Sequence, residues 1–559
     1  MEKRVVIFIV LSLVIILGYD LLLKQFGLLP SSPPSSTEAP TQQSGSPSPG
    51  DEPITDKRDS STAGQTELPA ARPKPADTTL PLSHPPTEQT VTVETDLVRV
   101  SLNSRGGVIS SWELKAYTTP PPERIPVQLV YQEGTFKGPL AITTSNEALD
   151  KTLHEGLYAI DADFTRLDAF RPVGHVTMSF ADASSGLKVK KQLTFHYGKY
   201  LVDVEIATEG LPELYEIVLG TNFGLVEWGE GFIGLIGSAA LVDGKVEKET
   251  PDHELEREGS VQWVALQDKY FLSVLMPQNG VAAVVKKEGD KLVSSSVRIA
   301  ASRGDSSGQL QLYAGPKEYD TLRALNVGLE ETIDFGWFIF GSWSVVKAVA
   351  KPLFYVLRFI NEYTHNYGVT IILLTVGIKL FFVPLQYKSY KSMKQMQVIQ
   401  PKVQALQEKF KDDRDKLNKE LIKLYRDHRV NPVGGCLPMV LQMPVFVALF
   451  NILYMTIDLR QAPFVGWITD LSVQDPYYVL PVVMGATMVI QQKITPTTMD
   501  PTQAKIMLVL PVFMTFLFIN FPAGLVLYWL TNNVLTILQQ IVTDRVFFPK
   551  KPLIVEPAK

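Results

Sequence analysis

Cysteine is almost absent from this 559-residue chain, in which Cys436 is the only one. No internal disulfide can form, so any domain outside the cytoplasm has to be held together by its core alone. The chain also has no G-x-x-x-x-G-K-[ST] sequence, no H-E-x-x-H sequence and no cysteine pair for a metal. The seven histidines are scattered. These absences predict a protein that is not an enzyme and that has no cofactor, metal site or catalytic residues, although spacing alone leaves a Ser–Lys or Ser–His protease open.

A strong charge of one sign is missing as well. The formal net charge is only −5, so no attraction to nucleic acid is expected and no specific nucleic-acid partner is predicted. Hydrophobic residues make up 45% of the chain, and the mean hydropathy is +0.07. This balance is too apolar for a purely soluble protein and too polar for one built only of membrane helices. A mixed architecture with a sizeable domain outside the bilayer is therefore expected.

The N-terminal region contains a basic start followed by an apolar run. Lys3 and Arg4 precede residues 5–23, which are about long enough to cross a bilayer, and no small-residue cleavage site follows directly. We interpret residues 1–27 as an uncleaved signal anchor, with a cleavable signal peptide as the alternative. Residues 28–90 are rich in Pro, Ser, Thr and Gly, and this composition predicts a disordered linker.

From residue 91 to residue 326 the sequence has the texture of β-structure. Short alternating or β-branched segments such as LVRVSL (97–102) and YLVDVEIAT (200–208) are separated by turn residues such as Arg105-Gly106-Gly107. Strands that follow one another without long helices between them favour a twisted β-sandwich. We expect one such domain over 91–326.

Residues 335–365 have the pattern of an amphipathic helix. Lys347, Lys351 and Arg358 fall on one helical face, and apolar residues such as Leu353 and Leu357 occupy other faces. This pattern is typical of a helix that lies in the membrane interface. A helix packed on the β-domain is the alternative.

Lys379 is a lone cation inside the apolar stretch 369–385. It lies roughly 15 Å along the expected helix, which is near the middle of a bilayer. A Lys at the centre of a membrane helix costs on the order of 3 kcal/mol. A water-filled cavity would offset this cost, so a polar cavity is predicted around Lys379. The alternatives are that Lys379 reaches an interface or pairs with a carboxylate.

A polar segment follows at 387–431, with twelve Lys or Arg residues against six Asp or Glu residues. Apolar residues recur in it at helical spacing on both sides of KDDRD (411–415), which predicts an antiparallel helical hairpin with a basic outer surface. Pro401 is expected to kink or start the first arm.

Four further apolar runs complete a count of six membrane spans. They occupy about 437–457, 477–492, 506–520 and 523–542. The loop at 458–476 is acidic, whereas the hairpin and the tail at 544–559 carry basic residues. The positive-inside rule then places both termini in the cytoplasm and the β-domain outside it. The predicted fold is a mixed membrane protein with a six-helix transmembrane part, an external β-sandwich and a cytoplasmic helical hairpin.

Several polar residues in the spans are candidates for lining the cavity. They are Thr375, which shares the face of Lys379, Trp529, Asn532, Asn533, Thr536 and Gln540 in the last span, and Gln442 in the third. Polar side chains inside a bilayer face a cavity or a partner helix, so hydrogen bonds between helices are the alternative. Methionines in the same spans would offer an adaptable apolar surface or simply fill gaps in packing. A nascent hydrophobic segment could slide along that surface while its polar flank crosses in the groove.

Residues from 368 onward resemble the YidC-type membrane protein insertases. The matching segments are NPVGGCLPMVLQMPVF (431–446), LRQAPF (459–464), DLSVQDPYYVLP (470–481) and FPAGLVLYWLTNN (521–533). In the β-region, WVALQDKYFLSVLMP (263–277) and LYAGPKEYDTL (312–322) resemble the Gram-negative form, which has a large periplasmic domain.

The resemblance implies a multi-pass inner-membrane insertase and chaperone for nascent membrane proteins, working alone or with the Sec translocon. It makes 368–543 the insertase core, with a groove open to the cytoplasm and the lipid bilayer, and it implies that the basic tail approaches the ribosome. The groove cation of the family is usually Arg, and Lys379 takes its place; Thr375 matches the groove Thr, and Trp529 stands where a Tyr is often found.

Two other classes of function remain open on the sequence alone. A channel or small-molecule transporter would also place a charge in a membrane cavity, although such proteins usually show internal repeats, and none is visible here. An assembly factor would use the external β-domain as its working part. Deleting residues 91–325 separates these classes, because an insertase core should still insert short proteins.

Overall fold

The computed structural model describes residues 87–120, 123–132, 137–226, 237–249, 254–289, 291–300, 307–333, 344–410, 413–428, 430, 437–495 and 509–547. The chain divides into the units Met1–Thr79 and Leu80–Lys559, and everything described here belongs to the second. The expected anchor at 1–27, most of the linker at 28–90 and most of the tail at 544–559 lie outside the described residues.

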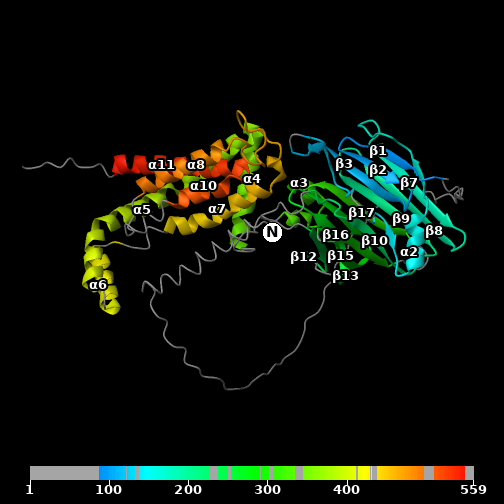
Figure 1. The fold of residues 1–559 in the computed structure, drawn as a ribbon, viewed down its shortest axis with the longest axis horizontal. Coiled ribbons are helices and arrows are strands. Elements are labelled where there is room, and N and C mark those ends of the chain that lie inside the picture. The colour runs from blue at the N-terminus through cyan, green and yellow to red at the C-terminus, as the bar shows by residue number, and fades with distance from the viewer. Residues whose placement is uncertain are drawn as a thin grey trace, which may run out of the picture. The chain divides into compact units, whose positions relative to one another are not determined.

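The first part of the described chain forms β-sheets (blue to green in Figure 1). A four-stranded antiparallel sheet has the order β1 (Thr90–Glu94), β2 (Val98–Asn103), β3 (Val108–Thr118) and β4 (Pro126–Gln128). The turn between β2 and β3 requires glycine, because Gly107 has a φ of +55° and an added Cβ would lie 2.7 Å from the ring of Tyr158.

A larger sheet continues the β-region. Its strands in spatial order are β5 (Ile142–Thr143), β10 (Leu214–Thr221), β16 (Leu292–Ala300), β15 (Gly280–Gly289), β13 (Leu255–Gln267), β14 (Phe271–Pro277), β17 (Ser307–Pro316), β9 (Leu201–Glu209), β8 (Leu187–His196), β7 (Val173–Asp182) and β6 (Ala159–Ala162). β11 (Gly237–Val242) pairs with β13 and with β12 (Lys245–Glu249). The short helices α2 (Glu147–Glu155) and α3 (Tyr319–Ala324) and the 3-10 turn η1 (Leu329–Thr332) lie between strands.

The two sheets share an aromatic core. Trp112 of β3 is fully buried, and its ring centroid lies 6.5 Å from that of Phe195 on β8 and 6.1 Å from that of Phe223. β7 and β8 alternate between buried and less buried residues along ten-residue strands, which is the pattern of sheets with one face on a core. The predicted β-rich character of the region at 91–326 is therefore confirmed.

Lys191 is an exception to the apolar lining of this core. It occupies an inward position of β8 and is fully buried. Its Nζ donates to the carbonyl oxygens of Gly107 and Leu140, each at 2.8 Å, and lies 4.9 Å from the ring centroid of Tyr158. Burial lowers the pKa of Lys191 to about 7. The side chain therefore ties the β2–β3 turn to the larger sheet through hydrogen bonds.

Replacing Lys191 with Met should change how the stability of the β-domain depends on pH. Between pH 7 and the ordinary Lys pKa the unfolded chain binds a proton that the folded chain does not, so the contribution of Lys191 to stability rises with pH by at most about 1.4 kcal/mol per unit. Below pH 7 both states are protonated and the contribution is flat. Hydrogen exchange of β8 amides in the full-length protein at pH 6 to 9 measures this slope relative to Lys191→Met. Parallel pH profiles for the two proteins would contradict it.

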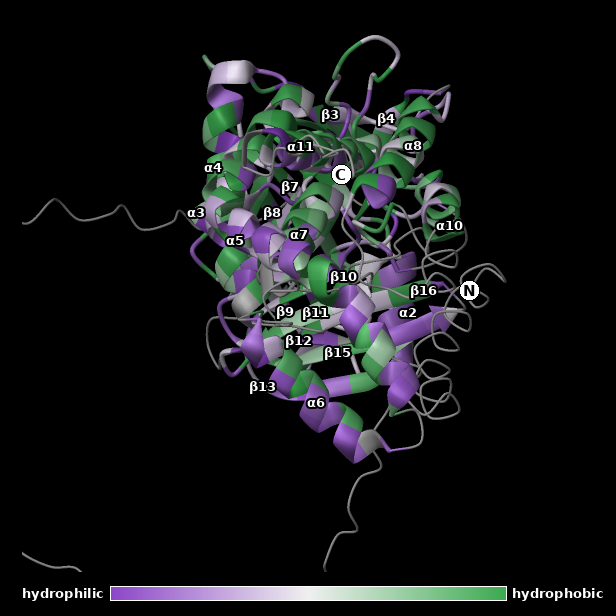
Figure 2. Ribbon diagram, turned by 90° about the vertical axis from the view of Figure 1, so that its left-hand side faces the viewer, coloured by the Kyte–Doolittle hydropathy of each residue, from purple (hydrophilic) through white to green (hydrophobic). Residues whose placement is uncertain are grey.

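The second part of the described chain is helical (green to red in Figure 1). Its elements are α4 (Ser344–Thr364), α5 (Tyr367–Lys409), α6 (Arg414–Asp427), α7 (Leu437–Met455), the 3-10 turn η3 (Ile457–Leu459), α8 (Val479–Ile494), α10 (Val509–Phe518) and α11 (Ala523–Phe547). In Figure 2, α8 and α10 are mostly hydrophobic, whereas α6 alternates between hydrophobic and hydrophilic residues.

Helix α4 corresponds to the amphipathic segment predicted at 335–365, whose first residues lie outside the described part. Lys347 and Lys351 are exposed, while Arg358 forms an ion pair with Asp320 of α3. Phe354 packs on Tyr319 at 5.5 Å between ring centroids. One side of α4 therefore packs on the β-domain, as the alternative interpretation expected. Another side of α4 contacts α5 and α7.

One helix replaces two predicted elements. α5 runs for 43 residues from the Lys379 span into the segment at 387–431, passing through Pro384 and Pro401. Pro401 therefore does not start a helix, because it lies inside α5, whose helical residues continue on both sides of it. The C-terminal part of α5 and the helix α6 form the hairpin. In it, Lys402 Nζ of α5 lies 2.9 Å from Nε2 of His428, which follows α6.

The six predicted spans are not all established by the described residues. There, α5 and the part of α11 from Ala523 to Arg545 are long and apolar enough to cross a membrane. The apolar helices at Gln442–Met455, Val479–Ile494 and Val509–Phe518 are shorter. The expected first span at 5–23 lies outside the described residues. The helical membrane region is confirmed, and the count of six remains a prediction.

Candidate functional site

Lys379 links α5 and α11, the two described helices that are long and apolar enough to cross a membrane, through a hydrogen bond. It lies on α5 with 7% of its surface exposed, and its Nζ donates to Thr536 Oγ1 of α11 at 2.8 Å. The hydroxyl of Thr536 in turn donates a hydrogen bond to the carbonyl oxygen of Asn532 at 2.6 Å. No carboxylate among the described residues forms an ion pair with Lys379. The ammonium thus sits in a mostly apolar helix pair with a hydroxyl as its partner.

Thr375 lies on the same face of α5, one turn before Lys379. It is 2% exposed, and its Oγ1 donates to the carbonyl oxygen of Ile371 at 2.6 Å. Because that proton is used within the helix, the Thr375 oxygen can take part in a further hydrogen bond only as an acceptor.

The predicted polar stripe on α11 is divided between two neighbouring helices. Thr536 faces Lys379 of α5, as described above. Asn533 Nδ2 donates to Thr487 Oγ1 at 3.3 Å, and Gln540 Nε2 donates to Thr495 Oγ1 at 2.9 Å. Thr487 belongs to α8 and Thr495 follows it, so Asn533 and Gln540 make the interhelical hydrogen bonds that were the alternative to a groove. Asn532 is half-buried and contributes its carbonyl oxygen to Thr536.

Trp529 lies two turns before Thr536 on α11 and belongs to an aromatic cluster. Its ring meets Phe446 of α7 edge-on at 4.9 Å between centroids and Phe518 of α10 at 4.7 Å. Half-buried, it packs α7, α10 and α11 together. The structure therefore separates Trp529 from the hydrogen bond of Lys379.

Gln442 marks the other end of the polar site. Its Oε1 accepts from Gln386 Nε2 of α5 at 3.5 Å. Gln386 was missed in the sequence, although it lies seven residues after Lys379 and therefore on the same helical face. Thr487 and Thr495 were also missed, because a lone Thr in an apolar helix carries no signal until its partner is known.

The far ends of α5 and α11 are also linked. Lys394 Nζ lies 3.2 Å from Asp544 Oδ1 and 5.5 Å from the ring centroid of Tyr390. This ion pair holds the extension of α5 against α11 beyond the polar site. The charges on the two residues were visible in the sequence, but their pairing across 150 residues was not.

Family comparisons cover almost the whole described chain. Residues 90–356 match the family described as "YidC periplasmic domain", and residues 359–551 match "60Kd inner membrane protein". A protein of Syntrophus aciditrophicus with the name "Membrane protein insertase YidC" is 40% identical over 492 residues, covering 85% of this chain and 88% of its own. One of the same name from Pelobacter propionicus is 38% identical over 572 residues, covering 98% and 99%.

A solved structure with the description "Active YidC insertase crystal structure with the first transmembrane domain resolved" also matches. It is 17% identical, covers 82% of this chain and 93% of its own, and superposes with a TM-score of 0.35.

Proposed function

The chain belongs to the YidC family of membrane protein insertases, and on that premise we propose that it inserts nascent segments into the inner membrane through a polar groove centred on Lys379. It is an inner-membrane protein with a periplasmic domain, of a family that does not act as an enzyme. The observation that carries the proposal is the buried ammonium of Lys379 in a membrane-length helix, hydrogen-bonded to Thr536.

Hydration of the groove follows from counting donors. A Lys ammonium has three N–H donors, and Thr536 accepts one of them. A charge with unsatisfied donors is costly in hydrocarbon, so water or a substrate group has to accept the others. Thr375 on the same face of α5 and Gln442 of α7 add side-chain oxygens that can accept hydrogen bonds from such groups.

Insertion then needs no nucleotide. The polar flank of a nascent segment exchanges bulk water for the hydrated groove, so its dry path across the bilayer becomes shorter. Lys379 favours acidic residues of that flank while they pass. The apolar part leaves sideways into lipid, where burial of its surface is worth roughly 25 cal/mol per Å² and drives the step.

Lys379 keeps the positive charge that Arg usually supplies in this family. A Lys ammonium is a compact point charge, whereas the guanidinium of Arg is a planar fork that binds a carboxylate through two parallel hydrogen bonds. We infer that Lys379 attracts acidic flanks by charge alone and holds them less firmly than Arg would.

The cytoplasmic elements complete the proposal. We infer six spans with both termini in the cytoplasm, so that the hairpin of α5 and α6 and the basic tail at 544–559 meet nascent chains as they leave the ribosome. Cations on exposed positions of α6, such as Lys416 and Lys419, support this placement. A chaperone role and cooperation with the Sec translocon belong to the same proposal.

Chemical labelling tests whether the groove is wet. Cys436 is the only cysteine, so Cys436→Ser gives a background for Thr536→Cys. We expect a charged maleimide to modify Thr536→Cys in inside-out membrane vesicles, because water reaches this position from the cytoplasm. Met484→Cys on α8, whose side chain is fully buried, serves as the control and should react only after denaturation. Equal protection of both positions would show that Lys379 lies in a dry helix contact.

A further inference from the structure

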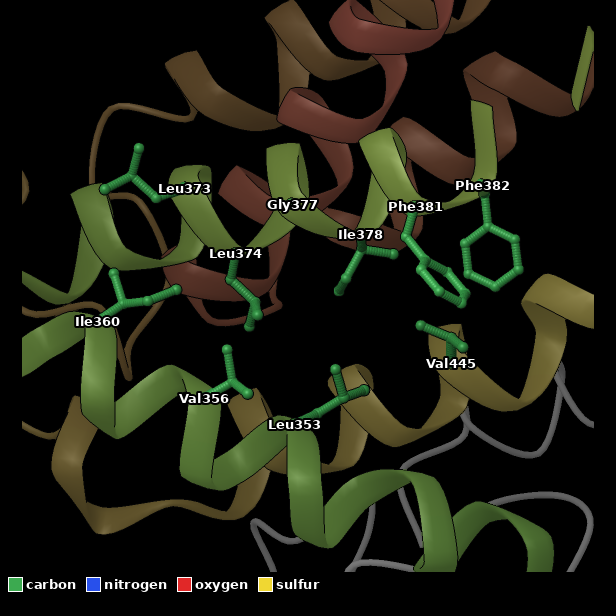
Figure 3. A pocket seen from close by; sticks show the side chains of 10 residues that line it. All are labelled: Leu353, Val356, Ile360, Leu373, Leu374, Gly377, Ile378, Phe381, Phe382 and Val445. Carbon is green, nitrogen blue, oxygen red and sulfur yellow. The ribbon is translucent and has the colours of Figure 1, made fainter. Parts of the chain in front are cut away.

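A second site lies on another side of α5. A cavity of about 310 Å³ opens between α4, α5 and α7 (Figure 3). Three of its lining residues come from α4, six from α5 and one from α7, among them Leu353, Val356, Leu374, Gly377, Ile378 and Val445. Every lining residue is apolar, so the cavity offers no hydrogen-bonding side chain to a polar ligand or to water.

Gly377 keeps the floor of the cavity open. A Cβ added there would meet nothing within 4 Å, in contrast to Gly368 on the same helix, where an added Cβ would collide with Phe464. A glycine in a helix interior costs about 1 kcal/mol relative to Ala, and no close packing at Gly377 explains it. Gly377 therefore borders empty volume, which a side chain much larger than a methyl group would fill.

The mouth of the cavity is continuous with the apolar surface of the membrane helices. Phe381 is 78% exposed, and Leu373 and Val356 at the rim are 45% and 44% exposed. Lys379 points away from this side, toward α11. The cavity is thus reached from the lipid and not from the polar site.

The position of α4 sets the depth of the cavity in the bilayer. Val356 and Phe359 are exposed on one side of α4, whereas Lys347 lies nine residues before Val356 and about 180° around the helix. A helix with these two faces lies in the interface with its cations toward water. The cavity is on the apolar side of α4, and its α5 lining includes Gly377 and Ile378 beside Lys379, so it extends from that interface toward the middle of the bilayer.

The volume limits what can enter. A helix is about 10 Å across with its side chains, so a single turn of about 5.4 Å fills about 420 Å³, which exceeds the cavity volume. The cavity is roughly twice the volume of an engineered dry cavity that binds benzene, which suits one flexible hydrocarbon chain. We propose that this cavity binds one acyl chain of a phospholipid from the leaflet in which α4 lies. The bound chain would fill the gap between α4 and α5 and support the interfacial position of α4.

Photolabelling in proteoliposomes tests the site. The full chain is reconstituted with a phospholipid that carries a diazirine in one acyl chain, and labelled peptides are mapped by mass spectrometry. We expect stronger labelling on the residues around Gly377 and Leu353 than on Val482 of α8, an apolar side chain that is 58% exposed. Gly377→Phe fills the cavity and should lower the labelling there several-fold.

Two variants control for disturbance of the helices. Gly377→Ala adds only the Cβ that has free space and should keep the labelling, and Val482→Phe adds the same aromatic ring outside the cavity and should leave it unchanged. The proposal would be overturned if the cavity residues were labelled no more strongly than Val482 and if Gly377→Phe did not change their labelling. It would also be overturned by crosslinks from the cavity to a stalled nascent chain that displace the lipid label, because they would assign the cavity to the substrate. Neither readout depends on insertion by the groove.

Discussion

Insertion of a short single-span protein into proteoliposomes is expected to fall about tenfold or more when Lys379 is replaced by Met, a change equivalent to at least about 1.4 kcal/mol in the barrier. Met has a similar length but cannot hold water or a carboxylate through charge. The groove would then be apolar and without water at this position, so the polar flank of the substrate would lose its hydrogen-bonding partners there. A protease-protection assay without ATP measures the rate.

The same substitution should not destabilise the folded protein. Thr536 keeps its hydrogen bond to the Asn532 carbonyl after the change, and the helix loses a charge that costs on the order of 3 kcal/mol at the membrane centre. Lys379→Arg is the matched control and should retain insertion, because the charge remains. Full insertion by Lys379→Met would show that groove polarity does not depend on this cation.

Replacing Trp112 with Ala should destabilise the β-domain by about 3–5 kcal/mol, the usual cost of emptying a large aromatic site. Trp112 is fully buried between the two sheets, and its Nε1 has no hydrogen-bond partner among the described residues, so the loss is one of packing. Hydrogen exchange of β8 and β9 amides in the full-length protein measures the change. Trp112→Phe fills most of the space and should cost less.

Insertion of short proteins by Trp112→Ala should match wild type, because the proposed groove lies wholly in α5, α7 and α11. This comparison distinguishes an insertase that works through the groove from an assembly factor that works through the β-domain. A parallel loss of insertion and of β-domain stability would favour an assembly factor whose external domain does the work, and it would count against the groove.

The fold was predictable where one pattern dominates a long segment. β8 and β9 alternate strictly because one face meets the core, and the membrane helices are apolar over most of their length. Short elements were not predicted, among them α2, although Asn146 caps it by accepting from the amides of Ala148 and Leu149. Of the two alternatives for Pro401, a helix start is wrong, because α5 continues through this proline; a kink there stays a prediction.

The sequence was enough to predict which residues belong to the candidate site, but not which of them contact one another. Lys379 and Thr536 stand out from their apolar neighbours, but their hydrogen bond spans 157 residues. The polar residues of α11 were expected to form one stripe, but they contact different neighbours. Thr536 contacts α5, Asn533 contacts α8, and Trp529 belongs to an aromatic cluster, because α11 packs against several helices. Lys191 carried no signal, since a lysine on a strand is usually solvated and only the tertiary fold buries it.

The most direct test of the groove is to ask which side chains touch a substrate during insertion. A photoreactive amino acid is placed at Thr536 or at Val482, and a ribosome-stalled single-span chain is added to vesicles that contain the full-length protein. The groove predicts crosslinks from position 536 to the polar flank of the nascent chain and few from position 482, which is exposed on α8. Crosslinks of equal strength from both positions, or none from position 536, would contradict it.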